Sequence, residues 1–138
     1  MKNLTSRNLA VLAGKLALEK QALDIKILDL RKISNISDYF VVCSATVDVH
    51  LKAIADNIVE ELGKKGVRVW HNEGYPQGRW IILDYVDVVV HIFLEEARQF
   101  YDLESLWGDA QVQEVSDNGK VKKTGKKTGL KARKRKLM

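Results

Sequence analysis

The sequence predicts an α/β fold: a small mixed sheet of about five strands flanked by helices. Two observations lead to this prediction. Apolar residues recur at helical spacing near residues 5–20 and 47–62, and they alternate or cluster as in β-strands elsewhere. Helices interleaved with strands favour a mixed sheet with helices packed against it. At 138 residues the chain is long enough for one domain with a substantial core.

The first half of the chain alternates between helix and strand. Leucines and alanines spaced three and four apart predict the first helix, and aromatic and β-branched residues mark the strands. These first elements are a helix over residues 5–20 and strands over residues 24–30 and 39–43. Ser44 and Thr46 are candidate N-caps of a second helix, which Gly63 and Gly66 end.

The second half reads as strands followed by a broken helix. A third strand is predicted over residues 67–71, two more within 74–93 with a reversal near 84–86, and a broken helix over 95–107. On the last strand Val86, Val88, Val90 and Ile92 share one face at period two, which predicts core. The opposite face carries Asp87, Val89, His91 and Phe93. That face is too polar for a second buried layer and too apolar for plain solvent, so we interpret it as a docking surface.

The chemistry of an enzyme is weakly represented. Residues 43–46 form a strand-to-helix corner where a nucleotidyltransferase would hold phosphate, but no Asp-x-Asp pair follows to bind Mg²⁺. The three histidines match no zinc pattern, and the single cysteine, Cys43, lies in an apolar run typical of a buried structural thiol. The sequence therefore predicts no catalytic residues, no metal site and no cofactor.

Charge divides the chain into two parts. Residues 119–138 hold 10 of the 23 basic residues and none of the 18 acidic ones, so residues 1–118 carry 13 basic against 18 acidic residues, a net charge of −5. We expect an α/β domain over 1–112 and a basic, disordered tail over 113–138. Because no aromatic residues are interleaved, the tail favours phosphate contacts without base stacking. Its candidate RNA contacts are Lys122, Lys123, Lys126, Lys127, Arg133, Lys134 and Arg135.

Two further absences bear on location. No apolar run approaches the roughly 18 residues needed to span a bilayer. Charged residues interrupt the apolar positions near the N-terminus, which is unlike a signal peptide. We expect a cytoplasmic protein with no membrane contact.

Several motifs carry a resemblance to a known family. Ser37-Asp38-Tyr39-Phe40, Glu73-Gly74, the run from Gly74 to Phe93, and Phe100-Tyr101-Asp102-Leu103-Glu104 with Leu106-Trp107 stand in the order found in the ribosomal silencing factor family, also called Iojap or YbeB-like proteins. The resemblance spans about residues 5–112. One departure is Val86, where many members have glycine, and it bears on the geometry of the turn.

The resemblance implies a fold related to nucleotidyltransferases without their catalytic motif. It also implies a non-enzymatic function: binding to the large ribosomal subunit through its interface protein uL14, which sterically blocks joining of the small subunit and represses translation when nutrients are scarce. The shared motif suggests a set of partner-binding residues: Trp80, Leu83, Asp84, Tyr85, Asp87 and His91. Trp80 and Leu83 would supply apolar contacts, Asp84 and Asp87 would accept from basic side chains, and Tyr85 and His91 would make polar contacts.

Two alternatives remain open on the sequence alone. One is a nucleotidyltransferase-like enzyme, and the other is a general RNA-binding protein that acts through the basic tail. The apolar sheet face also permits a homodimer when no partner is bound.

Overall fold

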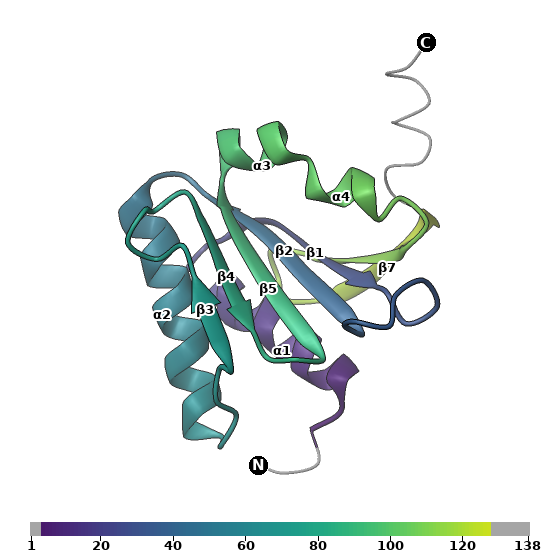
Figure 1. Ribbon diagram of the computed structural model, residues 1–138, viewed down its shortest axis with the longest axis horizontal. Helices are drawn as coiled ribbons and strands as arrows, with labels where there is room; N and C mark the ends of the chain where they lie inside the picture. Colours follow the sequence, from purple (N-terminus) through teal and green to yellow (C-terminus); the bar gives the residue numbers. More distant parts are fainter. Residues whose placement is uncertain (1–3, 128–138) are drawn as a thin grey trace.

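One seven-stranded sheet organises the computed structural model, which describes residues 4–127 (Figure 1). The elements in chain order are α1 (Ser6–Glu19), β1 (Leu23–Asp29), β2 (Tyr39–Ala45), α2 (Asp48–Lys64), β3 (His71–Glu73), β4 (Trp80–Asp84), β5 (Val88–Leu94), α3 (Glu95–Tyr101), α4 (Leu103–Leu106), β6 (Gln111–Val115) and β7 (Val121–Lys127). The strand order is β3-β4-β5-β2-β1-β6-β7. Strands β2 and β5 are parallel, and the other neighbouring pairs are antiparallel. The predicted mixed α/β fold is confirmed, with seven strands rather than about five.

Helices α1 and α2 cover one face of the sheet and form the larger core with it. Helix α2 buries Leu51, Ile54, Ile58 and Leu62 completely, at the spacing that the sequence predicted. Helix α1 approaches the sheet closely at Gly14, where an added Cβ would lie 3.1 Å from Cγ2 of Val115. No helix in residues 4–127 is both long and apolar enough to cross a membrane.

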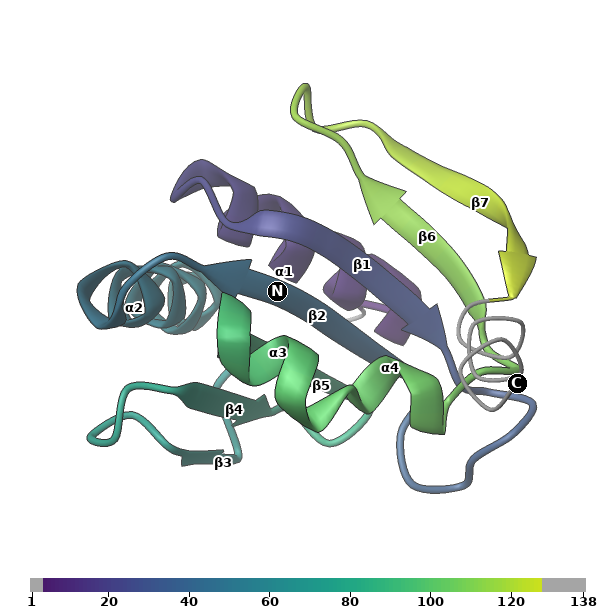
Figure 2. The same cartoon turned by 90° about the horizontal axis from the view of Figure 1, so that it is seen from above.

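A second, smaller core lies on the opposite face, under α3 and α4. Figure 2 shows these two short helices in front of the sheet and α1 behind it. Phe93 is fully buried there, and His91 is only 5% exposed. The expectation that this face was too polar for a second buried layer is therefore wrong for that part of it. The reason is that the ring is buried in its neutral form, with Nδ1 accepting a hydrogen bond from Trp80, so no charge is buried.

The folded sheet also continues beyond residue 112, where the sequence placed the start of a tail. Strand β6 pairs antiparallel with β1, and β7 pairs with β6. Val112 and Val115 are buried on opposite faces of β6, which anchors this strand in both cores. Of the candidate tail contacts, Lys122 and Lys123 are exposed on β7, and Lys126 and Lys127 also belong to that strand. Arg133, Lys134 and Arg135 lie outside the described residues.

Local differences from the predicted elements have simple causes. Ser44 lies inside β2, and the N-cap position of α2 is Val47, so neither predicted cap holds. The strand predicted over residues 67–71 is displaced to β3, because only Trp70 in the preceding segment bonds to β4, through its N–H to the carbonyl of Asp84 (2.8 Å). The break in the last helix is confirmed: Asp102, with φ +49°, separates α3 from α4.

Candidate partner-binding surface

The second face of the sheet is only partly covered, and its open part forms a shallow hollow of about 330 Å³. We call it the sheet hollow, and its lining residues are Ile36, Ser37, Phe40, Trp70, Asp84, Val86, Val89 and His91. Three large apolar residues around it are exposed: Ile36 (84%), Trp70 (71%) and Val86 (53%). Contiguous exposed apolar groups with a polar rim mark protein-binding sites on soluble proteins.

His91 lines the hollow as a buried, neutral side chain. Its Nδ1 accepts a hydrogen bond from Nε1–H of Trp80 (3.2 Å), so the ring proton lies on Nε2. Burial lowers the pKa of His91 to about 3, which keeps the ring uncharged at neutral pH. Nε2 has no hydrogen-bond partner among the described residues. It is therefore a buried donor for which a bound partner could supply the acceptor.

A strained turn forms one edge of the hollow. Val86 has φ +75°, and the N–H of Asp87 donates to the carbonyl of Tyr85 (3.0 Å), which closes a γ-turn around Val86. The N–H of Val86 donates to Oδ1 of Asp84 (2.7 Å). Positive φ is a steric outlier for a β-branched residue. Glycine, which many members of the ribosomal silencing factor family have at this position, adopts positive φ without this steric conflict.

Hydrogen bonds from a neighbouring segment hold the strained turn in place. The carbonyl of Asp87 accepts from the N–H groups of Asp38 (2.8 Å) and Tyr39 (3.1 Å). The hydroxyl of Ser37 donates to the carbonyl of Val86 (3.2 Å). Two of the motifs that carried the resemblance are therefore joined directly, since one supplies the turn and the other supplies its support.

The six predicted partner-binding residues do not share one surface. Trp80, Asp84 and His91 lie on the face of the hollow, and Asp87 is exposed in the turn. Leu83 (2% exposed) and Tyr85 (8%) instead belong to the core on the α1–α2 face. Because successive strand residues alternate faces, Leu83 cannot share the face of Asp84. The apolar contact predicted for Leu83 and the polar contact predicted for Tyr85 therefore do not fit the hollow.

Ile36 and Trp70 are the exposed apolar residues that the sequence reasoning missed. Ile36 directly precedes the Ser37-Asp38-Tyr39-Phe40 motif, and Trp70 directly precedes β3. These positions, next to a family motif and at the start of a strand, could have marked both residues as candidates for the partner-binding surface. Trp80 has a mixed role, because its ring packs on Phe93 (4.7 Å between centroids) and Tyr101 (4.8 Å) while it remains half-buried.

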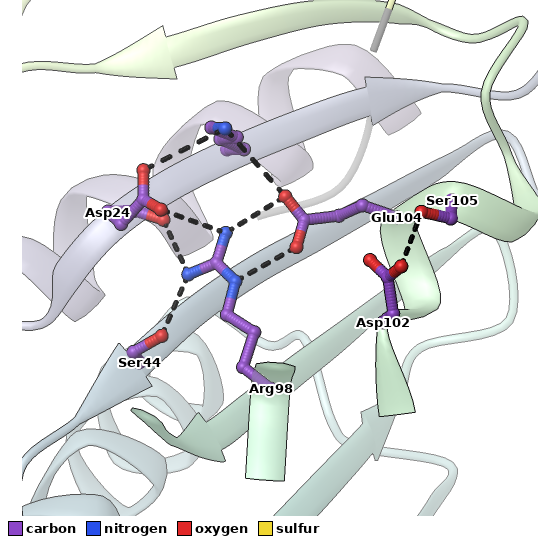
Figure 3. A network of polar contacts seen from close by, with 7 residues as sticks. Asp24, Ser44, Arg98, Asp102, Glu104 and Ser105 are labelled. Atoms are coloured by element: carbon purple, nitrogen blue, oxygen red, sulfur yellow. Dashed lines mark hydrogen bonds and ion pairs between the residues drawn. The ribbon is translucent and has the colours of Figure 1, made fainter. Parts of the chain in front are cut away.

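The corner that would serve a nucleotidyltransferase is filled by a buried arginine (Figure 3). Arg98 donates from Nη1 to the hydroxyl of Ser44 (2.8 Å) and to the carbonyl of Asp24 (2.8 Å). Its Nε and Nη2 form a fork with the two carboxylate oxygens of Glu104 (2.9 and 3.2 Å). Although burial opposes the charge, the hydrogen bonds and charge of Glu104 raise the pKa of Arg98. The αL residue Asp102 lets the chain turn so that Glu104 faces back toward Arg98.

The acidic groups at this corner are therefore committed to ion pairs. Glu104 contacts both Arg98 and Lys26, whose Nζ lies 3.8 Å from its carboxylate. Within residues 4–127 no group of three or more histidine, cysteine or acidic side chains is placed to hold a metal ion. Cys43 is buried beside this corner, and burial raises the pKa of its thiol to about 12. The arrangement is a structural clamp between α3–α4 and the sheet.

Comparisons with known proteins agree with this geometry. Residues 3–137 match the family model described as ribosomal silencing factor during starvation. The ribosomal silencing factor RsfS of Bacillus subtilis is 36% identical over 112 residues, which covers 81% of this chain and 95% of that protein. The chloroplastic protein Iojap of Zea mays is 35% identical over 101 residues, which covers 73% of this chain and 44% of that protein.

Solved structures show the same fold. A crystal structure of a protein from Chromobacterium violaceum superposes with a TM-score of 0.74 at 31% identity, covering 75% of this chain and 87% of that one. A crystal structure from Bacillus halodurans gives a TM-score of 0.63 at 35% identity, covering 73% and 91% of the two chains. The match of the family model over nearly the whole sequence, together with these relatives, shows that the chain belongs to the ribosomal silencing factor family.

Proposed function

We propose that this protein is a cytoplasmic repressor of translation that binds the large ribosomal subunit through its interface protein uL14. By occupying that site it sterically blocks joining of the small subunit when nutrients are limiting. Membership of the ribosomal silencing factor family supports the general role. The observation that carries the surface assignment is the sheet hollow, with Ile36, Trp70 and Val86 exposed around it.

The composition of the hollow suits a basic protein partner. Its apolar rim can be desolvated on contact, and a tryptophan is the residue type most often found at the energetic centre of an interface. Asp84 and Asp87 lie at its edge, and neither forms an ion pair with any described residue. Residues 1–118 carry a net charge of −5, and the five lysines of residues 120–127, which offset it, lie in or beside β7 at the far edge of the sheet. The two aspartates at the hollow are therefore the charges that favour a basic ribosomal protein. The donor on Nε2 of His91 adds a directional contact.

The proposal is tested most directly with substitutions of exposed residues, because these leave the core intact. Ile36→Asp and Trp70→Ser change the rim of the hollow. Val49→Asp is the matched control, since Val49 is 72% exposed on α2 and is absent from the hollow. Binding to purified large subunits is measured by sedimentation, and joining of the small subunit is followed by light scattering.

We expect Ile36→Asp and Trp70→Ser to weaken binding at least about tenfold, which corresponds to about 1.4 kcal/mol, and to restore subunit joining. The Val49→Asp variant should behave as the unmodified protein. Equal binding of all three variants would reject the sheet hollow as the docking surface. Association with subunits lacking uL14 would reject the partner.

The sequence left two other functions open, and the geometry favours them less. Arg98 occupies the corner that a nucleotidyltransferase would use for phosphate, and Glu104 is bound to it. If the protein instead acted only as a general RNA binder through the basic tail, removing residues 119–138 would abolish ribosome association. Under our proposal the shortened protein still binds. We also propose that the unbound protein can pair with a second copy through the hollow, in which case Ile36→Asp would make it monomeric in analytical ultracentrifugation.

A further inference from the structure

A second pocket lies at the end of the sheet where β1, β2, β6 and β7 come together near the start of α1. It has a volume of about 230 Å³, and its lining residues are Arg7, Asp29, Arg31, Tyr39, Gln111, Gln113 and Lys123. The strand register brings them together, because Asp29 is paired with both Tyr39 and Gln111, and Gln113 is paired with Lys123. None of these residues lines the sheet hollow.

This pocket, which we call the basic pocket, carries an excess of positive charge. Arg31 is bound to Asp29 through two side-chain hydrogen bonds (2.9 and 2.7 Å). Arg7 and Lys123 form no ion pair with any residue in the described part of the chain. Three cations against one carboxylate leave a net charge of +2. A neighbouring pocket of about 700 Å³ shares several of these residues and adds one lysine and one aspartate, Lys32 and Asp109, so the net charge stays at +2.

Tyr39 supplies the second, independent observation. Its side chain is 2% exposed, yet its hydroxyl has no hydrogen-bond partner among the described residues. Most buried hydroxyl groups in proteins do have a partner. The guanidinium of Arg31 lies over the tyrosine ring, 5.3 Å from its centroid. Burial raises the pKa of Tyr39, so the hydroxyl stays protonated and remains a donor. A buried donor beside a cationic pocket calls for an anionic acceptor.

We propose that the basic pocket binds a phosphate group of an RNA backbone. Arginine, lysine, tyrosine and glutamine are all among the side chains that contact phosphate oxygens in nucleic-acid complexes. Among the described residues that line the pocket, Tyr39 is the only aromatic one and it is buried beneath Arg31, so these residues offer no platform on which a base could stack. It therefore binds the backbone without reading sequence.

Among the described side chains of β7, Lys123 lines the pocket. Lys122 is exposed beside Lys123, and Lys126 and Lys127 follow on the same strand. Because successive strand residues alternate faces, Lys123 faces the pocket and Lys122, which pairs with Glu114, lies on the other face. The proposal is separate from the docking role of the sheet hollow, since the two sites share no residue.

The test uses the full chain and two probes: a single-stranded 12-nucleotide oligouridylate and inorganic phosphate. Tyr39→Phe removes only the hydroxyl, and Arg7→Ala and Lys123→Ala each remove one cation. Lys15→Ala is the matched control, because Lys15 is an exposed cation of α1 that is absent from the pocket. RNA affinity is measured by fluorescence anisotropy over a range of salt concentrations, phosphate binding by ³¹P NMR, and stability by thermal unfolding.

We expect Tyr39→Phe to weaken RNA binding roughly tenfold, in line with loss of a hydrogen bond to a charged group. Its melting temperature should be equal to or above that of the unmodified protein, because the substitution removes an unsatisfied buried hydroxyl. Arg7→Ala and Lys123→Ala should each lower the salt slope of log K by about 0.7, and Lys15→Ala should leave it unchanged.

Two outcomes would overturn the proposal. One is that Tyr39→Phe binds RNA as tightly as the unmodified protein and that Arg7→Ala, Lys123→Ala and Lys15→Ala all have the same RNA affinity and salt slope. The other is loss of inorganic phosphate binding with RNA affinity unchanged, which would assign the pocket to a free anion instead. Neither outcome depends on whether the sheet hollow binds uL14, because that docking is measured with large subunits.

Discussion

At position 86 glycine should be more stable than alanine, although glycine usually destabilises a folded chain relative to alanine. Val86 is the centre of a γ-turn with φ +75°, and left-handed backbone costs a non-glycine residue roughly 1–2 kcal/mol. Glycine adopts this conformation without the steric cost. The surrounding hydrogen bonds from Ser37, Asp38 and Tyr39 fix the turn, so the strain cannot be relieved by moving the backbone.

The size of the effect is the free energy of the relieved strain minus two separate losses. Glycine gives back about 0.4–1 kcal/mol, because it increases the conformational entropy of the unfolded chain. The valine side chain is 53% exposed, so its removal also loses about half of the roughly 1.5 kcal/mol that burial of a valine contributes. The two losses together are about as large as the relieved strain, so Val86→Gly should be about as stable as the unmodified protein. Val86→Gly should be more stable than Val86→Ala by about 1 kcal/mol, because alanine keeps the backbone strain and both variants lack the valine methyl groups.

Urea unfolding followed by circular dichroism measures these differences. The decisive comparison is between Val86→Gly and Val86→Ala, with Val89→Gly and Val89→Ala as the control pair on the neighbouring strand. At Val89, which does not have positive φ, glycine should be less stable than alanine by about 0.5–1 kcal/mol. At Val86 the order should reverse. If glycine is the less stable residue at both positions, the turn is not strained in solution and the reasoning fails.

Three further predictions concern the buried polar groups. Arg98→Met should destabilise the protein by about 3 kcal/mol, because it leaves Glu104 without its main partner. Adding Glu104→Leu should recover part of that loss. If the two substitutions instead have additive effects in urea unfolding, the two residues are not coupled. Lowering the pH from about 6.5 to 3 should destabilise the protein, because the unfolded chain binds a proton at His91 that the folded chain does not. The free energy of unfolding should fall by up to about 1.4 kcal/mol per pH unit, and this dependence should flatten in His91→Gln. An equally steep dependence in that variant would exclude His91 as the cause. Cys43 should react with a thiol reagent at neutral pH only as fast as the protein opens, because its thiol is buried and its pKa is raised to about 12; rapid modification of the native protein would contradict this.

Periodicity predicted the elements that bury a regular apolar stripe. Helix α2 and strands β1, β2 and β5 were found from spacing alone, because each one places its apolar residues toward a continuous core. Strand β7 could not be found in this way. Its residues are mostly lysine and glycine, which have low strand propensity, and it forms because β6 offers it an edge to pair with.

The candidate surface was predicted only in part, for a related reason. The motif containing Trp80, Asp84 and His91 was identified from the sequence, and the structure places these three residues on one face. Ile36 and Trp70 lie outside regular strands, so no periodic pattern showed whether they would be covered. Burial of Phe93 depends on α3 and α4 folding back over the sheet, a tertiary arrangement that is not encoded in the spacing along β5.

The pairing of β1 with β6 has a consequence for how the protein is made. Strand β1 leaves the ribosome early in synthesis, but its outer neighbour is supplied by residues 111–115, near the other end of the described chain. Until β6 arrives, Ile25 and Ile27 lie on a strand whose edge is unpaired, and such edges recruit other chains. Any fragment that ends before β6 would keep that edge permanently open. Aggregation of such a fragment would reflect a missing strand and would say nothing about the surface that binds a partner.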